Sequence, residues 1–178
     1  MKRKDFLKKS CSFGICACAM PAILGSNNLS AQETNTESWQ VRFSKDRFSI
    51  LSNILDEKLD EKTRNQILEN LGRECSKRSK IERFENDLQG FIDHLKNDWG
   101  ENATYDEEKK LIRVEGSKSE CFCPMFNHST VSKSICQCSV GWQSQTYETI
   151  TGLKAEAKCI ESVITGGKRC VFEIQLPG

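Results

Sequence analysis

Four cysteines lie close together in the segment CFCPMFNHSTVSKSICQC, where they form two C-x-C pairs. The first pair is Cys121 and Cys123, directly before Pro124, and the second is Cys136 and Cys138. Two thiolates with this spacing can bind one ion where the backbone bends, and zinc accepts such ligands in a tetrahedron. We predict that the second pair opens a helix, whose N-terminal partial positive charge lowers the pKa of a thiol. The segment therefore suits metal binding or thiol chemistry.

The spacing leaves several kinds of cysteine site open. A soft metal ion, zinc before others, is the leading interpretation. Disulfides between the two pairs are the main rival, because such bonds form in exported proteins. An iron–sulfur cluster and free thiols rank below these two. Twelve residues separate the pairs, a pattern that is less specific than the paired C-x-x-C spacing of zinc ribbons.

Other side chains could line a ligand pocket near the cysteines. His128 follows Cys123 by five residues, so it is either a ligand that replaces one thiolate or a solvated loop histidine. Phe126 and Trp142 are pocket candidates, although aromatic residues on an inner helix face are more often core. Glu161 is either a polar pocket residue or a solvated strand carboxylate. The sequence contains no H-E-x-x-H, no G-x-S-x-G and no phosphate-binding glycine loop.

The N-terminus has the order of an export signal. Residues 1–9 carry five basic side chains and one acidic one, residues 11–24 are apolar and small, and a polar run around Ala31 follows. The start resembles a twin-arginine signal with Lys4 in place of the second arginine, and Cys18 offers an alternative site for a lipid anchor. We therefore predict an exported protein of the periplasm or cell envelope, divided into a signal (1–31), a flexible linker (32–44) and one domain (45–178).

Charge and cysteine count restrict the partners. Five of the 26 basic and one of the 25 acidic residues lie in the signal, so the mature chain has a net charge of −3. It shows no clustered basic face, which excludes the footprint of a nucleic-acid-binding protein, and we expect no transmembrane span in it. Seven of the ten cysteines remain, and an odd number leaves at least one thiol outside intramolecular disulfides. The oligomeric state is open, with a dimer among the states allowed.

Periodicity predicts the elements that must position these residues. Apolar residues at steps of three and four predict helices from Lys45 onward, after Asp60 as an N-cap, and over 80–97 with Gly100 as the end. Two strands at 103–105 and 110–115 come next. The cysteine segment leads into a helix over 138–150 that ends at Gly152. The ranges 155–164 and 170–176 then predict a hairpin whose turn uses the positive φ of Gly166 and Gly167.

This order of elements indicates an α+β fold. Helices come first and strands later, so we expect N-terminal helices packed on an antiparallel sheet, with a C-terminal helix and β-hairpin. A doubly wound parallel sheet would instead require regular alternation of strands and helices.

The last sixty residues resemble a known superfamily. The strings CQCSVGW at 136–142 and GGKRCVFEI at 166–174, with ESVI at 161–164 between them, are similar to the vinyl-reductase-type small-molecule-binding domains and to the related L-2-amino-thiazoline-4-carboxylic acid hydrolases. They are most similar to uncharacterised bacterial relatives that carry C-x-C-P before C-x-C-x-x-G-W. The resemblance spans about Cys121 to Leu176.

The resemblance implies a fold with helices on an antiparallel sheet around a small-molecule pocket. Some members hold zinc with cysteines near this helix and in the final hairpin, which by position match Cys136 or Cys138 and Cys170. The second hairpin cysteine of those members falls at Ser162 here, and we infer that Cys121 and Cys123 supply the missing ligands. The hydrolases carry an acidic residue after their cysteine, which this chain lacks in the string SVGW.

We therefore expect an exported domain that binds a small organic molecule and holds zinc on Cys121, Cys123, Cys136, Cys138 and Cys170. One alternative is hydrolysis of a C–N bond in a small cyclic thiazoline or amide, by a cysteine nucleophile or a metal-bound water. Another is a purely structural envelope protein joined by disulfides. The sequence alone assigns no catalytic residue.

Overall fold

The computed structural model describes residues 37–117, 121 and 123–178. The chain divides into two units, 1–36 and 37–178, and only the second is described below. The predicted signal over 1–31, including Cys18, lies outside the described residues. No helix within the described residues is long and apolar enough to cross a membrane.

The first described helix, α2 (Trp39–Lys58), begins before the predicted start at Lys45. Ser38 caps it by accepting a hydrogen bond from the Val41 N–H, so 39–44, assigned from sequence to the linker, is helical. Its inner face carries the fully buried Ser49 and Ser52, small side chains that let the helix approach its neighbours closely. Six large apolar side chains on α2 are exposed, namely Trp39, Val41, Phe43, Ile50, Leu51 and Ile54.

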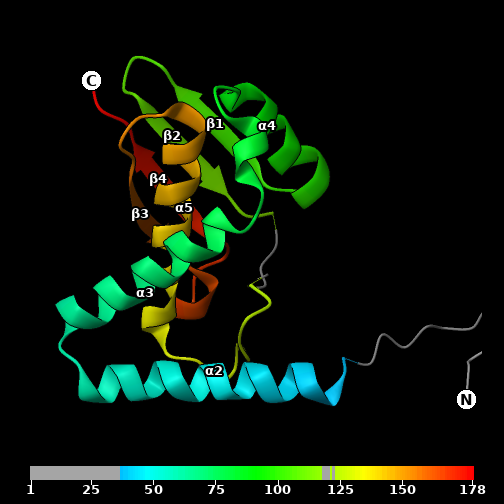
Figure 1. The fold of residues 1–178 in the computed structure, drawn as a ribbon, viewed down its shortest axis with the longest axis vertical. Helices are drawn as coiled ribbons and strands as arrows, with labels where there is room; N and C mark the ends of the chain where they lie inside the picture. Colours follow the sequence, from blue (N-terminus) through cyan, green and yellow to red (C-terminus); the bar gives the residue numbers. More distant parts are fainter. Residues whose placement is uncertain (1–36, 118–120, 122) are drawn as a thin grey trace, which may run out of the picture. The chain divides into compact units, whose positions relative to one another are not determined.

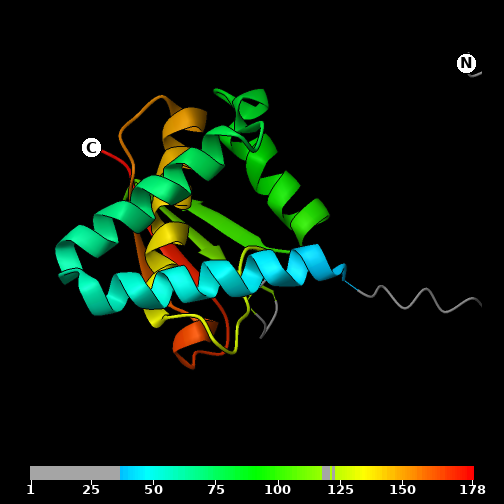
Figure 2. The ribbon, with the colours of Figure 1, turned by 60° about the horizontal axis from the view of Figure 1, so that its bottom comes forward.

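Helix α3 (Glu61–Lys77) begins where the sequence predicts. The Asp60 side chain caps it by accepting from the Thr63 N–H at 3.0 Å. This helix then crosses α5 (Cys136–Thr151), and the two views of the fold agree on that crossing (Figures 1 and 2). Leu68, on the face of α3 that packs inward, is buried.

The predicted third helix over 80–97 is wrong as one continuous element. The segment forms a 3-10 turn η1 (Ile81–Phe84), helix α4 (Leu88–His94) and a π-helical turn η2 (Leu95–Trp99). The break comes at Asn86, whose φ is +61°, and at Asp87, which caps α4 through the Gly90 N–H at 2.9 Å. Gly100 ends the segment with φ +68°, as predicted.

Four antiparallel strands form one sheet in the order β1-β2-β4-β3. The strands are β1 (Asn102–Asp106), β2 (Leu111–Glu115), β3 (Glu156–Glu161) and β4 (Val171–Gln175). The C-terminal strand β4 therefore lies between β2 and β3 and pairs with both. Helix α5 packs against β3 and β4 (Figure 1). The α+β prediction, with a C-terminal helix followed by a hairpin, is confirmed.

The ends of α5 and of the hairpin follow local rules. A 3-10 turn η3 (Lys133–Ile135) leads into α5, which begins at Cys136 rather than Cys138 and ends at Gly152 with φ +68°. The β3–β4 connection contains the short turn η4 (Val163–Thr165). Of the two glycines, Gly166 has the positive φ (+95°). Gly167 is required for space, since a Cβ there would lie 2.8 Å from the Ser162 carbonyl oxygen.

Two apolar clusters hold the described residues together. The larger one fills the space between the sheet, α4 and α5, and includes Phe91, Ile112, Tyr147, Ile150 and Ile174. The smaller one consists of Leu68, Phe126 and Ile135, with Cys121, Cys123, Cys136 and Cys138 packed against it. The cysteine segment is thus part of a second, smaller core next to α2 and α3.

Candidate functional site

Seven cysteines gather at one end of α5. They come from five places in the described chain, and each is a half-buried free thiol. Cys75 lies on α3, and Cys121 and Cys123 lie in the loop after β2. Cys136 and Cys138 belong to the first turn of α5, Cys159 lies on β3, and Cys170 comes directly before β4. The fold therefore brings together thiols that are almost a hundred residues apart in the sequence.

Four of these thiols form a group that we call the hairpin-side thiols: Cys121, Cys136, Cys159 and Cys170. The side chains of Cys121 and Cys170 lie close enough to affect each other's pKa. The same holds for those of Cys136 and Cys159. The Ser162 hydroxyl lies 2.9 Å from the Cys136 Sγ and also hydrogen-bonds with Cys170. The group is therefore two thiol pairs joined by one serine.

The two pairs are electrostatically alike, because each has one acidic thiol. The hydrogen bond from Cys121 lowers the pKa of Cys170 to about 6, against the opposing effect of burial. The hydrogen bond from Cys159, with a smaller one from Ser162, lowers the pKa of Cys136 to about 7. The pKa of the second thiol in each pair is raised. For both Cys121 and Cys159 the larger cause is hydrogen bonding to the partner thiol, and the next is burial. Each pair can thus hold one thiolate and one thiol near neutral pH.

The remaining thiols form a second group, the helix-side thiols: Cys75, Cys123 and Cys138. Burial, followed by the charges of the other two, raises the pKa of Cys138 to about 12. Burial also raises the pKa of Cys123. The pKa of Cys136 is lowered by its interactions with Cys159 and Ser162, so the effect of the helix N-terminus stays a prediction, whereas at Cys138 desolvation raises the pKa.

The predicted metal ligands are divided between the two groups. Cys121, Cys136 and Cys170 lie among the hairpin-side thiols, whereas Cys123 and Cys138 lie beside Cys75. Within the described chain, no three side chains of His, Cys, Asp or Glu are placed closely enough, as they stand, to share one ion. The donors are nonetheless sulfur atoms, the ligands that soft metals prefer.

Two contributors were missed by the sequence reasoning. Cys159 is not among the predicted ligands, yet its thiol interacts with Cys136. Its position on the segment before the hairpin turn was the available signal, because β3 runs beside β4 and Cys170. Cys75 is not among them either, and it lies near Cys123 and Cys138.

The four residues predicted to line a ligand pocket lie in different surroundings. His128 is exposed and its ring nitrogen is 3.3 Å from the Cys123 carbonyl oxygen. Phe126 is buried in the smaller core, while Trp142 packs on the larger one. Glu161 accepts hydrogen bonds from the backbone N–H groups of Lys168 and Arg169, so it fixes the β3–β4 loop.

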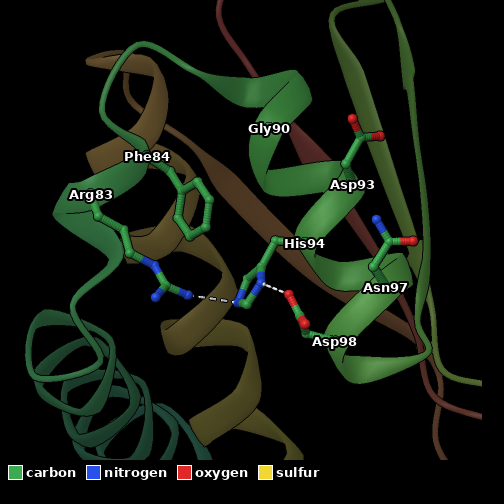
Figure 3. A pocket seen from close by; sticks show the side chains of 7 residues that line it. All are labelled: Arg83, Phe84, Gly90, Asp93, His94, Asn97 and Asp98. Atoms are coloured by element: carbon green, nitrogen blue, oxygen red, sulfur yellow. Dashed lines mark hydrogen bonds and ion pairs between the residues drawn. The ribbon is translucent and has the colours of Figure 1, made fainter.

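A shallow depression lies apart from the thiols, between η1 and α4 (Figure 3). His94 is at its centre: one ring nitrogen is 2.8 Å from Arg83 Nη2 and the other contacts Asp98. The side chain of His94 is 16% exposed. Both ring nitrogens are occupied, and the lining residues include no serine, threonine or cysteine. The arrangement fits a structural role.

A buried acid and a buried phenol lie near the hairpin-side thiols. Glu101 is 5% exposed, and burial, then the charge of Cys170, raises its pKa to about 7. Tyr147 is fully buried, and burial followed by the charge of Glu101 raises its pKa. Within the described residues the Tyr147 hydroxyl is the one buried side-chain oxygen or nitrogen without a hydrogen-bond partner. An unpaired buried hydroxyl is unfavourable, so this point is suited to a polar group from outside the chain.

The chain was compared with known proteins, and no family model and no curated protein matches it. Among solved structures, it is similar to a trafficking protein particle complex subunit 3 from Naegleria fowleri covalently bound to palmitic acid. The identity is 13%, the TM-score 0.51, and the match covers 74% of this chain and 90% of that one. A vinyl-4-reductase family protein from Methanocaldococcus jannaschii matches at 17% identity and a TM-score of 0.36, over 72% and 76%. The first likeness concerns the fold alone.

Proposed function

We propose that this chain is a small-molecule-binding protein whose hairpin-side thiols take up a soft metal ion, zinc before others. The observation that carries the metal proposal is the grouping of four thiols from the loop after β2, α5, β3 and the start of β4. Cys121, Cys136, Cys159 and Cys170 supply the four sulfur ligands that a closed structural zinc site uses.

The arrangement of these thiols is compatible with such a site after small side-chain movements. A cysteine turns about a single side-chain bond, so its sulfur can move without a change in the backbone. The Ser162 hydroxyl already lies beside Cys136 and Cys170 and would act as a hydrogen-bond donor to bound thiolates. Cys121 and Cys159, with raised pKa values, would release protons on binding, so the affinity should rise with pH.

The first test is zinc content together with free-thiol titration, on protein purified without reducing agent. Zinc at one ion per chain that is lost on chelation, with a lower Tm, would support the site. The variant Cys159→Ser should lose the metal, whereas the control Cys75→Ser, from the helix-side thiols, should keep it. Protein that binds no zinc even when fully reduced would contradict the proposal.

Binding of a small organic molecule has separate support. The unpaired Tyr147 hydroxyl of the larger core and the buried Glu101 carboxyl, whose pKa is raised to about 7, offer polar partners for such a molecule. The similar trafficking-complex subunit was solved with palmitic acid, so this fatty acid is a reasonable first probe. Calorimetric titration with palmitic acid should show binding that weakens in Tyr147→Phe. Equal affinity of that variant would remove Tyr147 from the proposed binding site, and no binding would remove this probe from the proposal.

Hydrolysis remains the enzymatic alternative, since Cys170 and Cys136 have the lowered pKa values that a thiol nucleophile needs. Its test is turnover of L-2-amino-thiazoline-4-carboxylic acid before and after alkylation of the thiols. Loss of turnover in folded protein would favour the thiol route, and absence of turnover in the untreated protein would reject this substrate. Export is also proposed, and fractionation of cells that express the full chain tests it.

A further inference from the structure

We propose that the hairpin-side thiols are also a site of reversible oxidation, at which Cys121 forms a disulfide with Cys170 and Cys136 one with Cys159. This inference goes beyond the proposed function and does not depend on metal binding. It also differs from the simplest expectation from the sequence, in which one C-x-C pair bonds to the other. Each predicted bond instead joins one C-x-C cysteine to the β3–β4 hairpin.

Backbone contacts hold the first pair together. Cys170 lies directly before β4, where its carbonyl oxygen accepts a hydrogen bond from the Gly116 N–H at 2.9 Å. Gly116 immediately follows β2, and Cys121 comes five residues later. The thiol of Cys121 interacts with that of Cys170 at the start of β4. Two thiols held in contact in this way are suited to direct bond formation.

The second pair is held by the packing of α5 on β3. The Ala157 N–H of β3 donates to the Ser144 hydroxyl of α5 at 3.1 Å, which fixes the strand against the helix. The first turn of the same helix carries Cys136, and the next inward position of the same strand carries Cys159. Their thiols are in contact, and the Cys159 thiol also approaches the Glu161 carbonyl oxygen at 3.5 Å.

The alternate cysteine of each C-x-C pair lies toward α3. Cys123 and Cys138, each two residues from a hairpin-side thiol, lie near Cys75 of α3, and Cys123 is also within charge range of Cys136. At this crossing, a Cβ on Gly72 would be 1.8 Å from the Cys138 carbonyl oxygen, so the two helix backbones are in close contact. One thiol of each C-x-C pair therefore belongs to the hairpin and the other to α3. Because the helix-side group has three members, at least one of them stays a thiol.

The oxidation requires a partner that accepts two electrons, and a small disulfide such as oxidised glutathione supplies it. A thiolate of one pair attacks this disulfide, forms a mixed disulfide and releases one glutathione thiolate. The second thiol of the pair loses its proton, attacks the protein sulfur of the mixed disulfide and releases the second glutathione. The protein thus loses two electrons and two protons per bond, and the oxidant becomes two thiols. Sulfurs bonded in this way no longer act as thiolate ligands for a metal.

The experiment is a disulfide map of metal-free protein oxidised with oxidised glutathione, alkylated and digested. We expect peptides that link Cys121 to Cys170 and Cys136 to Cys159. The C-x-C spacing supplies matched variants: Cys121→Ser should abolish the first link and Cys123→Ser should keep it. Likewise Cys136→Ser should abolish the second link and Cys138→Ser should keep it. Circular dichroism checks that each variant remains folded.

Links between Cys121 or Cys123 and Cys136 or Cys138 would overturn the proposal, as would protein in which all seven thiols remain alkylatable after oxidation. Loss of either predicted link in the Cys123→Ser or Cys138→Ser control would overturn it as well. The metal proposal fails separately, through absence of zinc from the reduced protein, so the two outcomes are distinguishable.

Discussion

Within the described residues, the Ser162 hydroxyl lowers the pKa of both acidic thiols. It lies at the end of β3, is buried, and accepts a hydrogen bond from the Ile164 N–H while it contacts Cys136 and Cys170. A hydroxyl that donates to a thiolate stabilises the charged form and lowers the pKa of that thiol. A serine at this position therefore preserves thiolate character without adding another sulfur.

We expect Ser162→Ala to raise the pKa of both Cys136 and Cys170, because each thiolate loses a donor. Metal-free, reduced protein should then be alkylated by iodoacetamide more slowly at pH 7, by roughly two- to tenfold, since the thiolate is the nucleophile. Ser144→Ala is a matched control, because the Ser144 hydroxyl accepts a hydrogen bond from a backbone N–H of β3. Unchanged alkylation of Cys136 in Ser162→Ala would show that the hydroxyl does not stabilise that thiolate.

The residue types of the site could be predicted from sequence, but their partners could not. The two C-x-C pairs are visible as local spacing, and so is the approach of Cys136 to a helix N-terminus. The division of each pair between two groups depends on the α3–α5 crossing and the hairpin, which bring in Cys75 and Cys159 from distant elements. Glu101 is likewise one acid among 25 in the sequence, and its burial depends on how η2 meets the sheet.

At the scale of elements, two glycines set the distance between α3 and α5. Gly72 of α3 faces the Cys138 carbonyl oxygen, and Gly141 of α5 faces the Glu69 carbonyl oxygen; a Cβ at these sites would lie 1.8 and 1.9 Å away, respectively. Neither glycine has a positive φ, so what excludes a side chain is space. The missing side chain of each glycine thus leaves room for the backbone of the other helix. The helix-side thiols lie beside this crossing.

We expect Gly72→Ala and Gly141→Ala each to lower the free energy of unfolding by about 3 kcal/mol or more, at the upper end of overpacking effects. Urea unfolding measures this loss. Helix propensity alone would make each alanine variant more stable by about 1 kcal/mol. A loss of stability would therefore identify the clash between the two helix backbones as the cause. Gly152→Ala is the control: it has open space around it, and its φ of +68° should cost only about 1–2 kcal/mol. A neutral or stabilising Gly72→Ala would mean that the helices do not cross this closely.

Three helix ends followed sequence rules. Asp60 begins α3, while Gly100 and Gly152 end their helices, as predicted. Periodicity failed over 80–97, because the apolar spacing continues through a place where Asn86 takes a left-handed conformation and Asp87 starts a new helix. The start of α2 was missed because Ser38 caps a first turn whose apolar residues, Trp39 and Phe43, remain exposed.

At the scale of the whole molecule, β4 takes a central place in the sheet. The strand order β1-β2-β4-β3 brings the C-terminal strand between two earlier ones, a pairing that no local pattern specifies. The class of fold could be predicted because it depends only on the order of helices and strands. Glu101 lies close enough to Cys170 and Tyr147 for charge to act between them, so its ionisation should affect the stability of the whole fold.

The raised pKa of Glu101 predicts how stability depends on pH. The folded state holds the Glu101 proton up to about pH 7, whereas the unfolded state releases it near the ordinary value of 4.5. Between these values the folded state binds more protons, so stability is greatest below pH 4.5 for this group and falls as pH rises toward 7. The slope is at most about 1.4 kcal/mol per pH unit. The lowered pKa values of Cys136 and Cys170 act in the opposite direction, but only above about pH 6.

The measurement is urea unfolding of reduced, metal-free protein between pH 4.5 and about 6, for the wild type and Glu101→Gln. The glutamine has a similar shape and no titrating proton, so this variant should lose the part of the pH dependence that comes from Glu101. Glu101→Gln should be about as stable as the wild type at pH 4.5 and more stable than the wild type near the upper limit of this pH range. Asp106→Asn is a control, because its exposed carboxylate has a pKa lowered by Lys109 and should retain the Glu101 slope. If Glu101→Gln showed the same slope as the wild type, the carboxyl would be ionised throughout and in contact with water. The buried Glu101–Tyr147 pair would then not be the neutral polar point that the small-molecule proposal requires.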